Sequence, residues 1–136
     1  TNSTFADNNA PSGTASGILV ATFGAPASAT LTNNVLMGKG GAFACAIEGG
    51  AAATITSGGG NVIGDDSCNP AGSDLASTDS VLGPLADNGG TMLTHALGAG
   101  SPAIDFAGSG ACPATDQRGT IRPQGAGCDA GAVERT

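Results

Sequence analysis

Residues 29–36 read Ala29-Thr30-Leu31-Thr32-Asn33-Asn34-Val35-Leu36, and the same succession returns as Ala53-Thr54-Ile55-Thr56 and Asn61-Val62-Ile63. Two related pairs occur in the same order: Ser3-Thr4-Phe5 resembles Asn34-Val35-Leu36, and Ile18-Leu19-Val20 resembles Ala44-Cys45-Ala46-Ile47. Each segment is short, aliphatic and bounded by Gly, Asn, Ser or Pro, which is typical of a β-strand between turns. Three kinds of short strand therefore repeat along the first half of the chain.

Like segments that recur in a fixed order indicate a solenoid rather than a meander of hairpins. Phe5, Leu36 and Ile63 follow one another at 31 and 27 residues, and Leu31 and Ile55 lie 24 residues apart. The pattern predicts an all-β fold, a right-handed parallel β-helix of about three short coils, over residues 1–69. Asn34 and Asn61 are expected to stack at one turn, where Asn tolerates left-handed geometry. The alternative, a flexible Gly/Ala/Thr linker, would not place aliphatic residues so regularly.

Residues 70–136, here called the C-terminal region, lose the repeat and gain Pro and Asp. Gly and Pro interrupt the whole stretch, so long helices are not expected there. The sequence predicts an irregular cap over the end of the coils, within the same domain and held by disulfides.

The composition argues against several classes of binding partner. The chain has 136 residues, 24 of them Gly, with 3% aromatic and 11% charged residues and a formal net charge of −7. It has no basic patch for nucleic acid or an anionic lipid surface, and no apolar run approaches a membrane span. The first coil begins at Thr1 without a polar or helical cap, so its strand edge is expected to be covered by further chain or to pair with a second copy.

Four cysteines are present: Cys45, Cys68, Cys112 and Cys128. An even count in a small Gly-rich chain favours disulfides and an oxidising, extracellular or cell-surface location. A metal site is the weaker alternative, because no Cys-x-x-Cys spacing exists and His95 is the single histidine. Three pairings can be drawn, and the two most local ones, Cys45–Cys68 and Cys112–Cys128, are favoured.

Charged residues gather near the C-terminus: Asp116, Arg118, Arg122, Asp129 and Glu134. They are interpreted as structural ion pairs, since Arg suits bidentate clamping of carboxylates. The alternative is a carboxylate pair for glycoside hydrolysis or polysaccharide β-elimination. No residue is predicted to be catalytic.

Other polar residues receive structural interpretations first. His95 lies between apolar residues, which favours a packed, hydrogen-bonded side chain over a general base. Asp65-Asp66 and the acidic residues between Asp74 and Asp79 could bind Ca²⁺, but they lack known calcium-loop patterns. Helix-capping and Asx-turn roles are therefore preferred, and no cofactor is predicted.

Residues 59–134 resemble the C-terminal region of choice-of-anchor Q domain proteins, a family of bacterial surface proteins. The resemblance is carried by these blocks: Gly60-Asn61-Val62-Ile63-Gly64-Asp65, Leu82-Gly83-Pro84-Leu85-Ala86-Asp87-Asn88-Gly89-Gly90, His95-Ala96-Leu97, Gly100-Ser101-Pro102-Ala103-Ile104-Asp105, Asp116-Gln117-Arg118-Gly119, Arg122-Pro123 and Cys128-Asp129-Ala130-Gly131-Ala132-Val133-Glu134. It implies a secreted right-handed β-helix and brings no catalytic residues. Val133 departs from the family pattern, which commonly has Tyr there.

The sequence thus predicts a non-catalytic extracellular structural or adhesive module of a bacterial surface protein, able to assemble into fibres through its first coil. Its expected partners are another copy, a polysaccharide or a cell-surface ligand. The alternative is a terminal fragment of a β-helical polysaccharide lyase or glycoside hydrolase, although sugar sites usually use aromatic platforms that this chain lacks. A third idea is ice binding by a ladder of Thr30, Thr32, Thr54 and Thr56.

Overall fold

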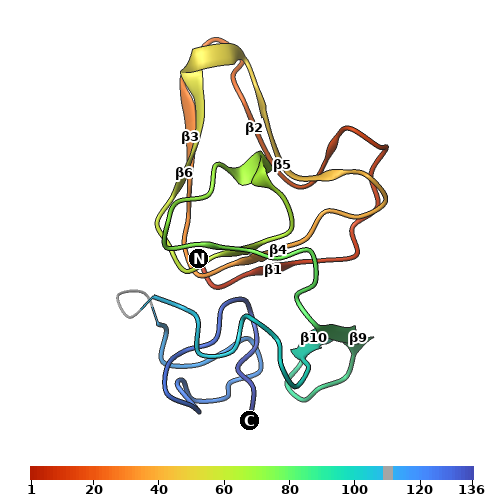
Figure 1. The fold of residues 1–136 in the computed structure, drawn as a ribbon, viewed down its shortest axis with the longest axis vertical. Coiled ribbons are helices and arrows are strands. Elements are labelled where there is room, and N and C mark those ends of the chain that lie inside the picture. The colour runs from red at the N-terminus through yellow and green to blue at the C-terminus, as the bar shows by residue number, and fades with distance from the viewer. Residues whose placement is uncertain (109–111) are drawn as a thin grey trace.

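The computed structural model describes residues 1–108 and 112–136, and shows short strands joined by turns (Figure 1). The elements in chain order are β1 (Thr4–Phe5), β2 (Ala15–Ala21), β3 (Ala27–Leu31), β4 (Val35–Leu36), β5 (Phe43–Glu48), η1 (Gly50–Ala52), β6 (Ala53–Ser57), β7 (Val62–Ile63), η2 (Asp66–Cys68), β8 (Leu75–Ala76), β9 (Leu82–Ala86) and β10 (Thr94–Leu97). Within the described residues no α-helix forms, and η1 and η2 are single 3₁₀ turns.

Parallel pairing joins the first eight strands into three stacked sheets, in the orders β1-β4-β7-β8, β2-β5 and β3-β6. Thr4 lies opposite Val35, Val35 opposite Val62, and Val62 opposite Leu75. These pairs confirm the parallel stacking that the recurring segments predict. The boundary expected after residue 69 stays a prediction, and parallel pairing continues past it into β8.

One predicted register is wrong. Leu31 was expected beside Ile55, but Ala29 lies opposite Ile55 and Leu31 lies opposite Ser57. The preceding strands β2 and β5 already pair Ala21 with Glu48. The chain continues directly from this pair into β3 and β6, so the register of those two strands can differ from it only slightly. A shift of two residues keeps every side chain on its original face, so the aliphatic pattern alone could not detect it.

The predicted asparagine stack is present and has a third rung. The Asn61 side-chain oxygen accepts from the backbone N–H of Asn34 (3.0 Å) and from its amide (2.9 Å). The Asp74 Oδ1 atom then accepts from the backbone N–H of Asn61 (3.0 Å) and from its amide (2.9 Å). Each rung satisfies a backbone donor at the turn before a strand, which ties successive coils together.

Both faces of the four-stranded sheet are apolar. Leu36 and Ile63 point into the coils with Val20 and Ile55, whereas their neighbours on β4 and β7 point outward, as strand alternation requires. The outward residues pack against the C-terminal region in a second cluster: Val35, Val62, Leu97, Ala103 and Ala130. A sheet that is apolar on both faces needs a covering layer on each side.

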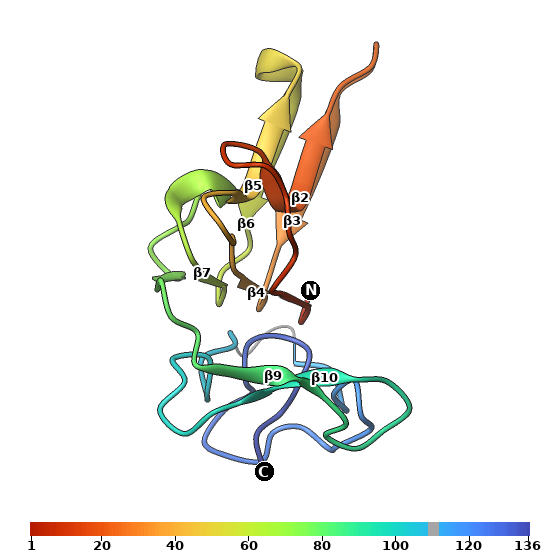
Figure 2. The same cartoon turned by 90° about the vertical axis from the view of Figure 1, so that its right-hand side faces the viewer.

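Residues 82–108 and 112–136 therefore lie along the side of the coils, below β1 and β4 in Figure 1 and below β4 and β7 in Figure 2. The expectation of a cap over the end of the stack is wrong for these residues, whereas β8 of the same C-terminal region does extend the stack at its last coil. Contacts to the first two coils fix the place of the covering residues: the Gly131 N–H donates to the Asn33 carbonyl (2.8 Å), and the Ala132 N–H donates to Oγ1 of Thr4 (3.0 Å).

The two ends of the stack differ. At the third coil, Asp65 accepts from the Ala44 N–H (2.9 Å) and the Ser67 hydroxyl accepts from the Cys45 N–H (2.9 Å). The Cys45–Cys68 disulfide, with 5.0 Å between Cα atoms, fastens the same edge. At the first coil, β1, β2 and β3 each pair on one side only among the described strands.

Candidate functional site

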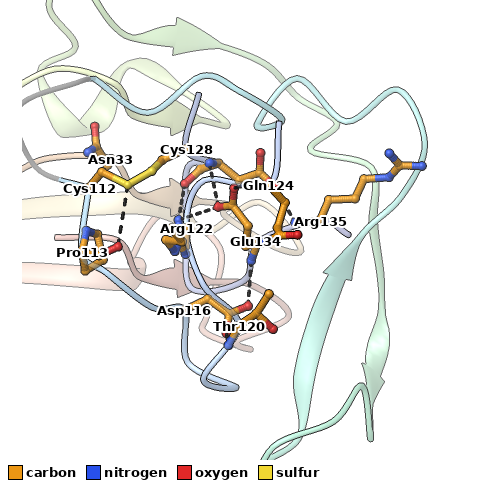
Figure 3. A network of polar contacts seen from close by, with 12 residues as sticks. Asn33, Cys112, Pro113, Asp116, Thr120, Arg122, Gln124, Cys128, Glu134 and Arg135 are labelled. Atoms are coloured by element: carbon orange, nitrogen blue, oxygen red, sulfur yellow. Dashed lines mark hydrogen bonds and ion pairs between the residues drawn. A yellow bond between two sulfur atoms is a disulfide. The ribbon is translucent and has the colours of Figure 1, made fainter. Parts of the chain in front are cut away.

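Two ion pairs form inside the C-terminal region, Arg118 with Asp116 and Arg122 with Glu134 (Figure 3). The carboxylate of Asp129, also predicted to form an ion pair, accepts from backbone N–H groups instead. Asp116, Arg122, Asp129 and Glu134 are buried, and only 13% of the Arg118 side chain is exposed. The segments that carry them are loops without regular strands, so their backbone polar groups depend on side chains for partners. We call these five residues the charged network.

Asp116 is the centre of one half of the charged network. Its Oδ1 accepts from the N–H groups of Arg118 (2.7 Å) and Thr120 (2.9 Å), and its Oδ2 accepts from the Glu134 N–H (2.9 Å). Nε of Arg118 also donates to Oδ2 (2.9 Å), and its Nη2 lies 2.8 Å from that atom. Burial by itself would raise the pKa of Asp116, but hydrogen bonds, led by those from Glu134 and Arg118, outweigh it and hold the pKa below its usual range.

Arg122 and Glu134 form the other half. Nη1 of Arg122 lies 3.2 Å from Oε2 of Glu134, and both side chains are only 1% exposed. The same guanidinium donates to the carbonyls of Asp129 (2.6 Å) and Gly131 (2.8 Å). Glu134 accepts in addition from the N–H groups of Gln124 (2.9 Å) and Asp129 (3.0 Å).

Asp129 links this network to the rest of the C-terminal region. Its carboxylate accepts from the N–H groups of Asp105 (2.8 Å) and Arg135 (2.6 Å). The adjacent Cys128 is bonded to Cys112, with 6.1 Å between Cα atoms. Both disulfides therefore follow the local pairing that the sequence favours.

This arrangement can clamp loops together but offers little to a substrate. The three carboxylates each accept from two or more backbone N–H groups, and none is exposed. A general acid or base must reach a substrate proton, directly or through water. The geometry therefore favours a structural role for the network over the carboxylate pair of a glycosidase, which must flank a bound sugar.

The remaining sequence candidates are also engaged in local structure. Nδ1 of His95, on β10, lies 2.8 Å from the Gly83 carbonyl, so that nitrogen is the donor. Asp65 caps η2 by accepting from the Ser67 N–H (2.9 Å), and Asp79 accepts from the Val81 N–H (2.8 Å) in an Asx turn. Within residues 1–108 and 112–136, no group of three or more His, Cys, Asp or Glu side chains is placed to hold a metal ion.

Sequence reasoning missed a surface pocket between the first coil and the C-terminal region. It has a volume of about 480 Å³ and is lined by residues that include Asn2, Pro113, Thr115, Gln117 and Arg122. The available signal was the repetition of Asn2 and Asn33 at the turn before successive strands, which the alignment of Ser3-Thr4-Phe5 with Asn34-Val35-Leu36 already contains.

Comparison with known protein families, with curated proteins and with solved structures gives no match to this chain. The described part of the chain contains no helix long and apolar enough to span a membrane.

Proposed function

We propose that this chain is a non-catalytic structural module of an extracellular bacterial surface protein, built on a right-handed parallel β-helix that self-associates through its first coil. The two disulfides support an oxidising location. The family resemblance of residues 59–134 supports the bacterial surface, and the burial of the charged network, whose carboxylates accept from backbone N–H groups, supports a role without catalysis.

The open edge of the first coil carries the proposal. Among the described residues, the outer edges of β1, β2 and β3 have no partner strands. Unpaired strand edges are templates for pairing with another chain. Apolar side chains are exposed on or beside β2, with Leu19 at 53% and Phe23 at 94%.

The structure of the far end of the stack limits how two copies could pair. Residues 65–69 occupy the edges of β5 and β6 there, through the Asp65 and Ser67 contacts and an Asn69 bond to the Ile55 carbonyl (3.1 Å). All three strands of the first coil have an unpaired edge among the described residues, whereas at the far end β8 is the strand that does, so the first coil finds three matching edges on another first coil. We therefore favour a closed pair of first coils over the fibre that head-to-tail stacking would give.

Sedimentation velocity over a concentration series tests the proposal. A dimer is expected, and Leu19→Lys should weaken it, because an added charge on an edge strand opposes pairing. Met92→Lys is the matched control, since Met92 is 64% exposed in the loop between β9 and β10. A monomer at millimolar concentration, or equal weakening by both variants, would overturn self-association.

A second candidate function is ice binding. Thr30 lies opposite Thr56, Ser28 lies opposite Thr54, and all four side chains are exposed on the outer face of β3 and β6. The corrected register thus replaces Thr32 with Ser28 in the expected ladder. A thermal-hysteresis assay on the wild type and on Thr56→Lys tests it, and absence of hysteresis in the wild type would exclude it.

A further inference from the structure

A second pocket lies at the corner where the coils meet the β9–β10 hairpin (Figure 1). Its volume is about 420 Å³, within the range of about 300–1,000 Å³ that pockets for small molecules occupy. One wall is built by the turns that follow β1, β4, β7 and β8, and the other by the start of β9 and by His95 on β10. Three of these four turns lie beyond the first coil, so the wall is made by stacking the same turn in successive coils.

The pocket brings together the single lysine and the single histidine of the chain, Lys39 and His95. Nζ of Lys39 donates to Oδ1 of Asp7 (2.8 Å), and both side chains are more than half exposed. This hydrogen bond and the charge of Lys39 lower the pKa of Asp7, and the nearby His95 lowers it further. Polar side chains from different coils therefore meet in one pocket that solvent reaches.

Ser80 brings an unused hydroxyl to this pocket. The residue is only 5% exposed and lines the pocket. Its carbonyl accepts from the Ser101 hydroxyl (2.6 Å), but its own hydroxyl has no partner in the described part of the chain. The side-chain polar atoms there that are both unpaired and shielded from solvent belong to Asn2 and Arg122. The small exposed area of Ser80 therefore includes its hydroxyl.

Asp79 places a free acceptor next to this donor. Its Oδ1 accepts from the Val81 N–H (2.8 Å), whereas Oδ2 has no partner among the described residues, and the side chain is exposed at the pocket. Nδ1 of His95 donates to the backbone, which leaves Nε2 as an acceptor. The pocket thus offers donors from Lys39 and Ser80 together with acceptors from Asp79 and His95.

We propose that this pocket binds a ring of a neutral saccharide through two adjacent hydroxyl groups. The Asp79 carboxylate accepts from one sugar hydroxyl in a charge-assisted hydrogen bond, and the Ser80 hydroxyl donates to the next. A hydroxyl both donates and accepts, so a row of them satisfies a mixture of donors and acceptors. Met37 and Leu82, which are partly buried, line the same pocket and offer apolar surface to the C–H face of the ring.

Other classes of ligand fit less well. An anion would face the carboxylates of Asp7, Asp65 and Asp79 in a chain with a net charge of −7. An organic ammonium would lie beside the like charge of Lys39. A peptide strand would need a continuous row of backbone partners, and Pro84 removes one N–H from β9. No group of three or more His, Cys, Asp or Glu side chains in the described residues is placed to hold a metal ion.

Titration with three methyl glycosides tests the site: methyl β-D-glucopyranoside, methyl β-D-galactopyranoside and methyl α-D-mannopyranoside, which differ in the arrangement of their hydroxyls. Because His95 is the single histidine, its ring C–H signals in ¹H–¹³C NMR spectra report on the pocket without overlap. We expect saturable shifts of these signals with at least one glycoside. Ser80→Ala should weaken that binding about threefold or more by removing one hydrogen bond, and it leaves no protein group unpaired.

Ser73→Ala is the matched control, because Ser73 is exposed and does not line the pocket, and it should leave the affinity unchanged. Sorbitol, which has adjacent hydroxyls without a ring, and cadaverine, a diamine, should not give saturable shifts. The proposal is overturned if no glycoside moves the His95 signals, if Ser80→Ala binds as well as the wild type, or if sorbitol or cadaverine binds as the glycoside does.

Two further measurements define the ligand and separate this site from self-association. Tighter binding of the hexasaccharide than of the matching glycoside would identify a polysaccharide, and equal affinity would identify a single sugar unit. Leu19→Lys, which should weaken the dimer, should bind the glycoside as the wild type does, because Leu19 does not line the pocket. Loss of glycoside binding in Leu19→Lys would show that the site needs a second copy and would overturn the assignment to this pocket.

Discussion

Replacing Arg122 with Met should strongly destabilise the C-terminal region. The substitution keeps an apolar stem but removes the guanidinium that contacts Glu134 at 3.2 Å and the carbonyls of Asp129 and Gly131 at 2.6 and 2.8 Å. The side chains of Arg122 and Glu134 are each 1% exposed, so the Glu134 charge would stay buried without its partner. Removing one member of a buried pair costs about 3–5 kcal/mol, a large share of the stability of a typical domain.

Urea unfolding with intact disulfides, followed by circular dichroism, measures the loss. Arg135→Met is the matched control: Arg135 is exposed, its side chain points away from the network in Figure 3, and the change should stay within about 0.5 kcal/mol. Arg122→Lys should recover only part of the loss, since an ammonium cannot reproduce the planar fork. Adding Glu134→Gln to Arg122→Met should recover some stability by removing the unpaired charge.

A loss below about 1 kcal/mol for Arg122→Met would refute the clamp, since one ordinary hydrogen bond is worth that much. Equal losses for Arg122→Met and Arg135→Met would refute it as well, because they would show that the position in the buried network does not matter.

Three further predictions concern other parts of the molecule. Reducing the Cys45–Cys68 bond, which spans 23 residues, should cost about 3 kcal/mol in the chain-entropy model, and peptide mapping that joins Cys45 to another cysteine would contradict the fold. The pKa of Asp116 is lower in the folded than in the unfolded chain, so the Asp116 carboxylate adds to the free energy of unfolding above the unfolded pKa of about 4. This stabilisation is lost as the pH falls through the folded pKa. Unfolding measured over a pH series should show the loss, and Asp116→Asn should make the stability depend less on pH in the acid range. Asn61→Leu should cost about 2–4 kcal/mol by removing the acceptor of the N–H and of the side-chain amide of Asn34, and an unchanged melting temperature would argue against the stack.

Much of the coil region could be predicted because stacking repeats the same local environment. Asn34 and Asn61 recur at the pitch of one coil, so their spacing alone placed them on adjacent rungs. The local cysteine pairing followed from the short separations in the sequence. The charged network was identifiable from the sequence, because the chain has few charged residues and five of them lie close together in its loops. Such a concentration suggests that these residues interact with one another.

The rest depended on information that a single sequence carries weakly. The register of β3 against β6 is ambiguous by two residues, because side chains in a strand repeat their direction with that period. Asp74 was missed as the third rung, since it breaks the asparagine pattern while keeping an acceptor in the same place. The equivalence of Asn2 and Asn33 was readable in the sequence, since they recur at the same offset as Phe5 and Leu36, but it was overlooked.

The position of the C-terminal region was nevertheless encoded in two dipeptides. Val35-Leu36 and Val62-Ile63 place aliphatic side chains on both faces of one sheet, whereas a solvent-facing sheet would alternate apolar with polar residues. The inner members fill the coils, and the outer members require a second layer, which the C-terminal region supplies. The charged network then holds the loops of this side layer together, through the pairs of Arg118 with Asp116 and of Arg122 with Glu134.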